Sequence, residues 1–525
     1  MMKILSSKSS TSQDLDTTKT FLIGLAIITC LANYWSIYLP ITPLFFILLL
    51  PLVIYGAILI SKRKRKIYGP IEIALLLFLT VAALCLSLGQ TPNIDEAGYY
   101  LPLVKWIETY AVTPGTALLN HRIGFNSGFH MLSAVFGIEA LLEGGVYKLN
   151  GLLFIVFNLY FFRRLFALWK GKKISLADLF LASALVFQFS FLLDSMDSDY
   201  LGIMGGIVVI AWSLEALTKP TTNREILALV IIGLFLFTIR PFNAFLLAAP
   251  AWLILTQKTY RKHLLFYLLL GVLIVLPWFI RNYYLTGYLI FPIYFLDLFS
   301  PDWKVPRQVA LASHDIISEF AKLEIIRPEY LYDSMTYPVI NEWFPLWVKR
   351  TWSMLIGKAV LVLAPLSFLL IIASNFVKDK FRLPKATRYY LIYTLPILAI
   401  WFFNYPSLRF GWAWILLLLA GGGMIAWKLT SLSSRVLIIL MTLVITLSWL
   451  RLAINLNYNN LLQYTIRPIP TKTIHPHKEV VTGHLILKYS EDPHCHGLVP
   501  PCLPYNNPLD IEQRGGSIED GFRLK

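Results

Sequence analysis

Residues 71–90 read IEIALLLFLTVAALCLSLGQ, and residues 91–102 continue as TPNIDEAGYYLP. The first stretch contains an apolar run long enough to cross a hydrocarbon core of about 30 Å. The second stretch places two carboxylates, Asp95 and Glu96, a few residues beyond that run. Ionisable side chains are expensive at membrane depth, and those that occur there are commonly functional. This junction therefore predicts a membrane protein with a candidate site at one end of a transmembrane helix.

The composition of the whole chain supports a membrane protein. Hydrophobic residues make up 57% of it and charged residues 14%, compared with roughly 25% charged residues in soluble domains. We predict an all-α integral membrane protein with about 13 transmembrane helices. An additional apolar stretch, 129–142, is shorter and is expected to lie at the interface or to re-enter the membrane. The expected spans are 21–38, 43–60, 71–88, 146–162, 175–193, 200–217, 225–239, 243–256, 264–280, 352–374, 389–403, 411–427 and 436–454.

The distribution of the net charge of +16 predicts the orientation. With the N-terminus in the cytoplasm, six short inner loops hold 22 Lys and Arg residues, whereas the short outer loops hold only Arg240 and Arg409. This asymmetry is the positive-inside pattern. The run KRKRK at 62–66 is therefore interpreted as a topology determinant, and no nucleic-acid partner is expected.

The same topology divides the chain into parts. The polar residues 1–20 are expected to be disordered and cytoplasmic, and a transmembrane hairpin with its basic loop follows at 21–70. The main transmembrane module covers 71–454 and the exported tail 455–525. Within the module, the long loops 89–145 and 281–351 are expected on the outer side together with the tail.

Cysteines and histidines are concentrated in the tail. Cys495 and Cys502 lie in CHGLVPPC, where an oxidising compartment permits a disulfide; two free thiols are the alternative. A zinc site is a weaker alternative, because the histidine spacings match no standard ligand pattern. Five of the nine histidines lie here, namely His475, His477, His484, His494 and His496.

The first long outer loop carries the candidate catalytic groups. Asp95 could act as a general base that takes a proton from a hydroxyl nucleophile. Glu96 is its neighbour, but adjacent helical residues point about 100° apart, so the two are not expected to share one role. The alternative is that both acids stabilise the start of a surface helix. Additional candidates in this loop are Tyr99, Lys105, His121, Arg122 and Asn126.

Three arginines at expected outer helix ends suggest an anion site. Arg240, Arg281 and Arg409 all fall on the same side as Asp95. Arginine binds phosphate through a planar fork of donors, so we predict that these residues bind the phosphate of a donor. Snorkelling anchors at the interface are the alternative for each. A second acidic site is expected at Asp197 or Asp199, for which a solvated turn is the alternative.

The chain resembles the glycosyltransferase C (GT-C) superfamily, which includes protein mannosyltransferases and the aminoarabinose transferase of lipid A. The resemblance lies in the acid of the large first outer loop, the arginines at later outer helix ends and about a dozen spans, and it covers 71–454. Several stretches are more closely similar to an uncharacterised family of bacterial polytopic proteins. They are NIDEAGYY, RIGFNS, RNYYLTGYLIFP, PSLRF, CLPY and DGFR.

The resemblance implies an inverting glycosyltransferase of the bacterial inner membrane. The C-terminus would be periplasmic, the donor a polyprenyl-phosphate-linked sugar, and the acceptor a glycan, glycolipid or protein. Asp95 corresponds to the loop acid of the superfamily, and Asp199, or less closely Asp197, to its second acid. Metal dependence stays open, because Asp95, Glu96 and Asp199 could together hold a hydrated Mg²⁺ or Mn²⁺. A lipid-linked glycan polymerase or ligase, a flippase and a non-catalytic scaffold are the alternatives.

Overall fold

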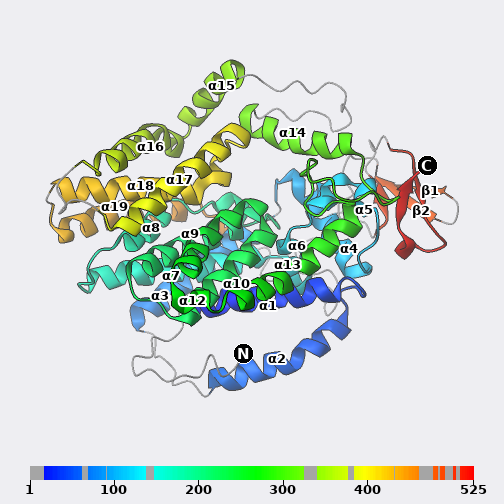
Figure 1. The fold of residues 1–525 in the computed structure, drawn as a ribbon, viewed down its shortest axis with the longest axis horizontal. Helices are drawn as coiled ribbons and strands as arrows, with labels where there is room; N and C mark the ends of the chain where they lie inside the picture. The colour runs from blue at the N-terminus through cyan, green and yellow to red at the C-terminus, as the bar shows by residue number, and fades with distance from the viewer. Residues whose placement is uncertain are drawn as a thin grey trace.

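The computed structural model describes residues 17–61, 69–89, 91–137, 147–323, 340–376, 383–430, 432–459, 477–482, 485–490, 500–503 and 509–525. Over these residues the chain is predominantly helical (Figure 1). Nine of the described helices are long and apolar enough to cross a membrane, which agrees with the expected multi-pass helical protein. They are α1 (Thr17–Trp35), α3 (Pro70–Ser87), α7 (Leu149–Trp169), α9 (Asp199–Thr218), α13 (Leu264–Thr286), α16 (Leu355–Ala373), α17 (Lys385–Asn404), α18 (Leu408–Thr430) and α19 (Ser434–Ile454).

The other four expected spans are also helical over all or part of their length in the described part of the chain. One of them, α2 (Pro43–Ser61), has 19 residues like α1, and the other three are shorter. The stretch expected at 175–193 differs most, because its helix ends at Ala184. The carbonyl groups released there are bonded by side chains of α19: Trp449 Nε1 donates to Leu185 O at 2.9 Å. Such side-chain donors make a broken helix tolerable within a membrane protein. The four stretches form α2 (Pro43–Ser61), α8 (Leu176–Ala184), α10 (Asn223–Ile239), and η4 (Pro241–Leu247) with α11 (Ala248–Thr256).

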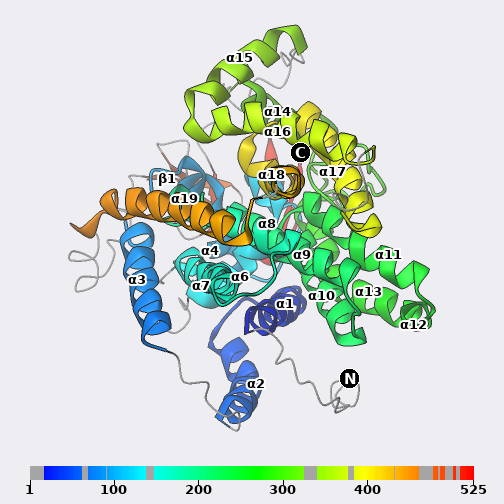
Figure 2. The same cartoon turned by 90° about the vertical axis from the view of Figure 1, so that its left-hand side faces the viewer.

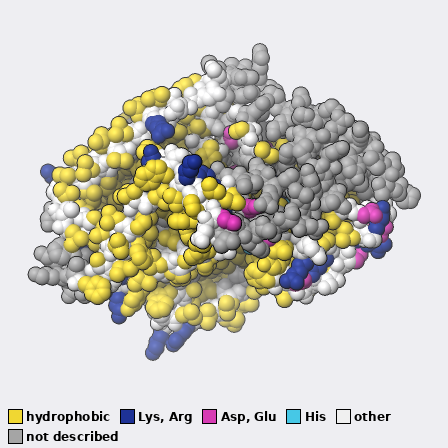
Figure 3. All heavy atoms as spheres, turned by 90° about the horizontal axis from the view of Figure 1, so that it is seen from above, with side chains coloured by type: hydrophobic (Ala, Val, Ile, Leu, Met, Phe, Trp, Pro, Cys, Tyr) yellow, Lys and Arg dark blue, Asp and Glu magenta, His cyan; other side chains and the backbone are white. Residues whose placement is uncertain are grey.

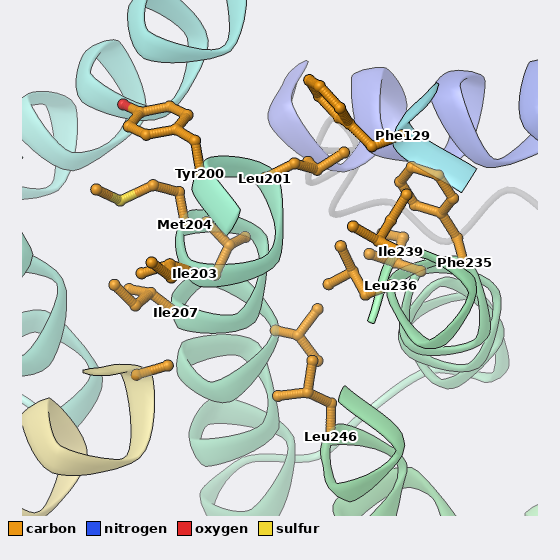
Figure 4. Packing of buried hydrophobic residues seen from close by; sticks show 14 of the residues in the cluster. Phe129, Tyr200, Leu201, Ile203, Met204, Ile207, Phe235, Leu236, Ile239 and Leu246 are labelled. Atoms are coloured by element: carbon orange, nitrogen blue, oxygen red, sulfur yellow. The ribbon is translucent and has the colours of Figure 1, made fainter. Parts of the chain in front are cut away.

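Helix α9 lies at the centre of the bundle (Figures 1 and 2). Within its most apolar window 78% of the residues are buried, compared with 17% for α19 at the periphery. Its apolar side chains pack against α10 and neighbouring segments, as Figure 4 shows for Leu201 of α9 and Leu236 of α10. A Cβ atom at Gly205 would lie 2.9 Å from a Leu236 methyl group, so this glycine permits the close approach of α9 and α10.

Short elements and the tail gather at one end of the molecule, which we call the loop end (Figure 1). The α14 helix contacts η2 there, and α5 contacts β5. The expected apolar stretch at 129–142 is the short helix α6 in its described part. The remaining helical elements are η1 (Glu96–Tyr100), α4 (Leu101–Thr109), α5 (Thr116–Leu119), η2 (His121–Phe125), α6 (Gly128–Gly137), η3 (Ser190–Leu192), α12 (Lys258–Arg261), α14 (Arg307–Leu323), α15 (Ile340–Ser353) and η6 (Ile518–Asp520).

The tail adds a small amount of β-structure to the expected all-α fold. One sheet has the order β1 (His477–Thr482), β2 (Leu485–Ser490), β3 (Cys502–Leu503), with β1 and β2 antiparallel and β2 and β3 parallel. The other pairs β4 (Ile511–Gln513) with β5 (Phe522–Leu524) in antiparallel register. The last strand docks on the first long loop, because Phe522 is fully buried and its N–H donates to Pro114 O at 2.9 Å.

The surface agrees with this division of the molecule. Seen from above, hydrophobic side chains cover much of the part formed by the long helices, and acidic and basic side chains gather at the tail (Figure 3). The long helices expose many large apolar residues, such as Leu265 on α13 at 70% and Leu355 on α16 at 73%. In lipid, such side chains avoid the free-energy cost of exposing apolar surface to water.

Candidate functional site

The sequence TPNIDE forms a tight turn that presents Asp95 at the loop end. The Asp95 N–H donates to Asn93 Oδ1 at 3.0 Å, and Asn side chains favour such turns. Asp95 precedes the single π-helical turn η1, but its side chain makes no capping hydrogen bond. Instead, Arg122 Nη1 donates to Asp95 Oδ1 at 2.6 Å. Asp95 thus stands at the N-cap position of η1 without a capping hydrogen bond, and its side chain faces η2 across the site.

Glu96 points elsewhere, as expected for the next residue of a helical turn. Its Oε2 accepts a hydrogen bond from the backbone N–H of Met196 at 2.8 Å. Asn93 Nδ2 donates to Ser195 Oγ at 3.4 Å in the same contact. Glu96 and Asn93 thus tie the first loop to the turn before α9, and Glu96 has a positioning role here.

That turn brings two more carboxylates to the site. Asp197 Oδ1 accepts from the N–H of Asp199 at 2.8 Å, which fixes the first turn of α9. An acid in the first turn suits the positive end of a helix. The side chains of Asp197 and Asp199 are 1% and 8% exposed. The second acidic site expected from the sequence is therefore buried within the protein, rather than a solvated turn.

Two of the three predicted arginines bind these aspartates. Pro241 ends α10 and leaves Arg240 extended, so that Arg240 Nη2 lies 2.8 Å from Asp199 Oδ1. Arg409 starts α18 and lies 3.3 Å from Asp199 Oδ2 through Nε. Its Nη1 is 3.6 Å from Asp197 Oδ2. Both guanidinium groups lie over the Phe410 ring, at 4.6 and 4.9 Å from its centroid.

Six residues from five separate segments thus form two adjacent groups of ion pairs at the loop end, and we call them the charged cluster. Asp95 of the first group is close enough to Arg409 of the second to act on it electrostatically. Three carboxylates face three guanidinium groups, so the cluster is formally neutral when every member is ionised. Its members are Asp95, Arg122, Asp197, Asp199, Arg240 and Arg409. An anionic ligand must therefore compete with a carboxylate for its arginine.

Burial shifts the titration of the groups around this cluster. Burial, and then the neighbouring Asp199, raises the pKa of Asp197, although Arg409 opposes the shift. Asp197 Oδ2 is buried without a hydrogen-bond partner among the described residues. The pKa values of Tyr99 and Tyr100 are also well above the usual range of tyrosine. Burial is the largest cause, and nearby aspartates add to it. Both phenols are therefore neutral hydrogen-bonding groups at physiological pH.

His130 is a buried residue beside Tyr99 and Tyr100 that was not predicted from the sequence. Its ring packs 4.9 Å from the ring of Tyr100 and 6.0 Å from that of Tyr99. Burial lowers the pKa of His130 to about 3, which keeps the imidazole neutral. The sequence signal for His130 is its position at the end of the stretch 120–130, which also contains Asn126 and Ser127.

Arg281, the third predicted arginine, belongs to a different group of contacts. It is 2% exposed, and its Nη1 and Nε donate to Ser36 Oγ and Asn126 Oδ1 at 2.8 and 3.3 Å. No ion pair joins it to a carboxylate in the described ranges of the chain. The backbone carbonyl oxygen of Asn126 accepts a hydrogen bond from Trp278 Nε1 at 2.7 Å, and Asn126 Nδ2 donates to Asn282 Oδ1 at 2.8 Å.

These contacts give Asn126 and Arg281 a positioning role. Asn126 has a positive φ of 38° and ends η2, the turn that carries Arg122. Three side chains of α13 therefore hold the turn that sets the Arg122–Asp95 pair. We expect Asn126→Gly, which keeps the left-handed backbone accessible, to lower the unfolding free energy by about 2–4 kcal/mol because buried partners lose their bonds.

Thermal unfolding of the purified variant in detergent tests this expectation. The control is Asn404→Ala. Alanine is used there because glycine would itself weaken the end of α17. Asn404 is exposed, and its amide donates to Ile400 O within its own helix, so a loss below about 0.5 kcal/mol is expected there. Equal losses in the two variants would contradict the positioning role.

The other predicted residues are not members of the charged cluster, and some of them lie outside the described residues. Lys105 bonds to Tyr147 and Glu108, and His121 starts η2. Cys502 starts β3, but Cys495 lies outside the described residues, so the disulfide stays a prediction. His475, His484, His494 and His496 also lie outside them, as does the side chain of His477.

A metal centre finds no preformed ligand set in the described part of the chain. No group of three or more His, Cys, Asp or Glu residues is arranged there to hold an ion. Asp95 faces Arg122, Glu96 faces the Met196 amide, and Asp199 faces Arg240 and Arg409. The three acids named for a hydrated cation thus point at different partners.

The fold and the site define a multi-pass helical membrane protein that gathers carboxylates and guanidinium groups at one end. The chain belongs to the family described as Domain of unknown function (DUF8201), whose model matches residues 1–416. The matched range includes every member of the charged cluster and ends before the tail. Neither a curated protein nor a solved structure matches this chain.

Proposed function

We propose that the protein is an inverting membrane glycosyltransferase that moves a sugar from a polyprenyl phosphate carrier to an acceptor hydroxyl at the loop end. In the transfer step the acceptor oxygen bonds to the anomeric carbon while its proton passes to Asp95. The bond from that carbon to the phosphate oxygen breaks, and the electron pair leaves with the polyprenyl phosphate. Guanidinium groups stabilise the charge that develops on this leaving group.

The convergence of the charged cluster is the observation that carries this proposal. Its carboxylates differ in access: the side chain of Asp95 is 30% exposed, compared with 1% for Asp197 and 8% for Asp199. A general base must reach the proton that it takes. Asp95 is the cluster carboxylate best placed to meet a substrate hydroxyl, and the two buried acids are better placed to orient the arginines.

The phosphate is best assigned to Arg409 and Arg240, with Arg122 beside them. Their side chains are 26%, 21% and 22% exposed, so their donors can be reached from the loop end. Planar guanidinium groups suit bidentate binding of phosphate oxygens. Arg281 is less suited to this role, because it is almost fully buried and its described bonds hold Asn126 and Ser36.

A lipid-linked glycan polymerase or ligase would use the same groups on a pyrophosphate donor, and it is the nearest alternative. A flippase would bind the lipid without any change in covalent bonds. The exposed carboxylate beside the arginines supports transfer, because a general base must reach the acceptor hydroxyl; a proton-coupled flippase would also use such a group, so the products decide between the two. The molecule that carries the transferred sugar identifies the acceptor as a glycan, a glycolipid or a protein.

Mass spectrometry of envelope glycans, glycolipids and glycoproteins tests the proposal. A deletion strain should lack one sugar modification, and a strain with Asp95→Asn protein at wild-type abundance should lack the same one. An unchanged glycan profile in the deletion strain would contradict transferase activity. Accumulation of lipid-linked glycan inside the cell, with no loss from the Asp95→Asn variant, would favour a flippase.

Orientation in the membrane is tested separately by cysteine labelling. If the loop end is periplasmic, Ser300→Cys in a background without other cysteines should react with a membrane-impermeant maleimide in intact spheroplasts. Lys219→Cys, at the opposite end of α9, should react only after permeabilisation. Ser300 and Lys219 are both exposed, so access to the reagent is decided by the side of the membrane. The reverse pattern would invert the topology.

A further inference from the structure

The amphipathic helix α14 spans two parts of the site. It packs against η2, the turn that carries Arg122. Further along, Ser318 Oγ donates to Asn404 O at 2.7 Å, in the turn that leads from α17 to Arg409. The helix therefore lies between the segments that carry two arginines of the charged cluster. A side chain on α14 that faces solvent there is positioned to meet a ligand bound at the loop end.

His314 on α14 is such a side chain. Its Nδ1 lies 3.0 Å from Asp315 Oδ1, and an ionised carboxylate can only accept a hydrogen bond. In the neutral tautomer that donates from Nδ1 to Asp315, Nε2 keeps its lone pair. The side chain of His314 is 22% exposed, whereas that of Asp315 is 8% exposed. Asp315 thus fixes the ring, and the imidazole remains accessible.

Aromatic rings from two other segments flank this histidine. The Tyr294 ring lies 5.7 Å from the imidazole at an interplanar angle of 82°, and the Tyr405 ring lies 5.6 Å away at 67°. Arg307 lies over the Tyr294 ring at 5.8 Å. Both tyrosines are partly exposed. Aromatic rings combine apolar faces with a polar tip, and binding sites add a few placed polar groups to such a lining.

We propose that His314, Tyr294 and Tyr405 form the acceptor subsite of the transferase. A pyranose ring of an acceptor glycan would pack against the tyrosines, and one of its hydroxyl groups would donate a hydrogen bond to His314 Nε2. The reacting hydroxyl is a different one, whose proton passes to Asp95. This inference rests on the proposed transferase function and commits the acceptor to a carbohydrate. His314 acts here as a binding residue and takes no proton.

Three substitutions at one position separate the hydrogen bond from packing. His314→Phe keeps a ring between the tyrosines but loses Nε2, whereas His314→Gln keeps a hydrogen-bond acceptor. His314→Ala loses both. We expect the transferred sugar, measured by mass spectrometry of the envelope glycans, to fall at least about tenfold for His314→Phe and His314→Ala, because a buried substrate hydroxyl is left unpaired. His314→Gln should restore a substantial part of the product.

Donor binding supplies the second measurement. Farnesyl methyl phosphate, a phosphodiester with a short polyprenyl chain, is titrated against the purified protein in nanodiscs. The dissociation constant should change less than about twofold in all three His314 variants, because the subsite holds the acceptor and not the phosphate. His263→Ala, in the turn before α13 at the opposite end of the molecule, is the matched control and should change neither measurement.

The outcomes separate the subsite from the transferase itself. Normal product in the His314→Phe strain, with product lost in the Asp95→Asn strain, would overturn the acceptor subsite alone. A loss of phosphodiester binding as large as the loss of product would move His314 to the donor side and also overturn it. Unchanged product in both strains would overturn the acceptor subsite and exclude Asp95 as the base. An unchanged glycan profile in the deletion strain would overturn the transferase function, and the acceptor subsite with it.

Discussion

Asp95→Asn should reduce sugar transfer by about 10²–10⁴-fold, the range typical for loss of a general base. The amide has nearly the same shape as the carboxylate, but it cannot take the proton of an acceptor hydroxyl. Arg122 also loses a charged partner that lies 2.6 Å away. The measurement is the rate of transfer from a polyprenyl phosphate sugar by purified protein in nanodiscs, with the envelope glycans of the same strain as a second readout.

Folding must be separated from chemistry in this experiment. The Asp95 side chain is 30% exposed, so its pair with Arg122 is expected to contribute only about 1 kcal/mol or less to stability. The variant should therefore insert and unfold like the wild type. Asp302→Asn is the matched control, because Asp302 also pairs with an arginine, Arg514, at the loop end. Transfer by Asp95→Asn within a few fold of wild type would exclude Asp95 as the base, and Glu96 would then be tested.

Much of this site was predictable from local sequence signals. Two kinds of residue stand out in the sequence. One is a carboxylate just beyond an apolar run, where a charge is costly at membrane depth. The other is arginine in outer loops, which are otherwise poor in basic residues. Asp95, Arg240 and Arg409 were found in this way and do meet at the loop end. The nine long helices were predictable for the same reason, since a span of this length and hydropathy has few alternatives.

The positions that sequence did not predict depend on tertiary contacts. Arg281 carries the same local signal as Arg409, but its neighbours in space are Ser36 and Asn126 rather than carboxylates. The helix expected over 175–193 ends at Ala184 because Trp449 and Ser448 of α19 bond the released carbonyls. His314 has no local signal, because Tyr294 and Tyr405 come from segments far apart in the chain.

Binding of an anionic phosphodiester should weaken by up to about tenfold for each pH unit above the pKa of Asp197, because one proton is taken up with the anion. Burial and the nearby Asp199 raise the pKa of Asp197 before any ligand binds. An anion that draws Arg409 away removes the positive charge that opposes this shift, so the bound state holds the proton more firmly. The dissociation constant of farnesyl methyl phosphate between pH 5 and pH 8 is the measurement.

The sign follows from which state holds more protons. Protonation of Asp197 removes one of the two carboxylate charges that Arg409 faces, although Arg409 stays paired with Asp199. An anion therefore binds the protonated form better, and its affinity falls as pH rises through the pKa of Asp197. A phosphodiester keeps one negative charge over this range, His130 stays neutral, and Tyr99 and Tyr100 stay protonated. Asp197 is therefore the group expected to titrate with binding among those that face the phosphate.

Asp197→Asn isolates this group, because an amide resembles the protonated acid at every pH. The variant should bind farnesyl methyl phosphate at pH 8 about as tightly as the wild type does at pH 5, with a flat profile between them. Asp302 pairs with Arg514, so Asp302→Asn should keep the wild-type slope. A slope that persists in Asp197→Asn would assign the linked proton to another group, with Asp199 next, since Asp199 shares Arg409 and also holds Arg240.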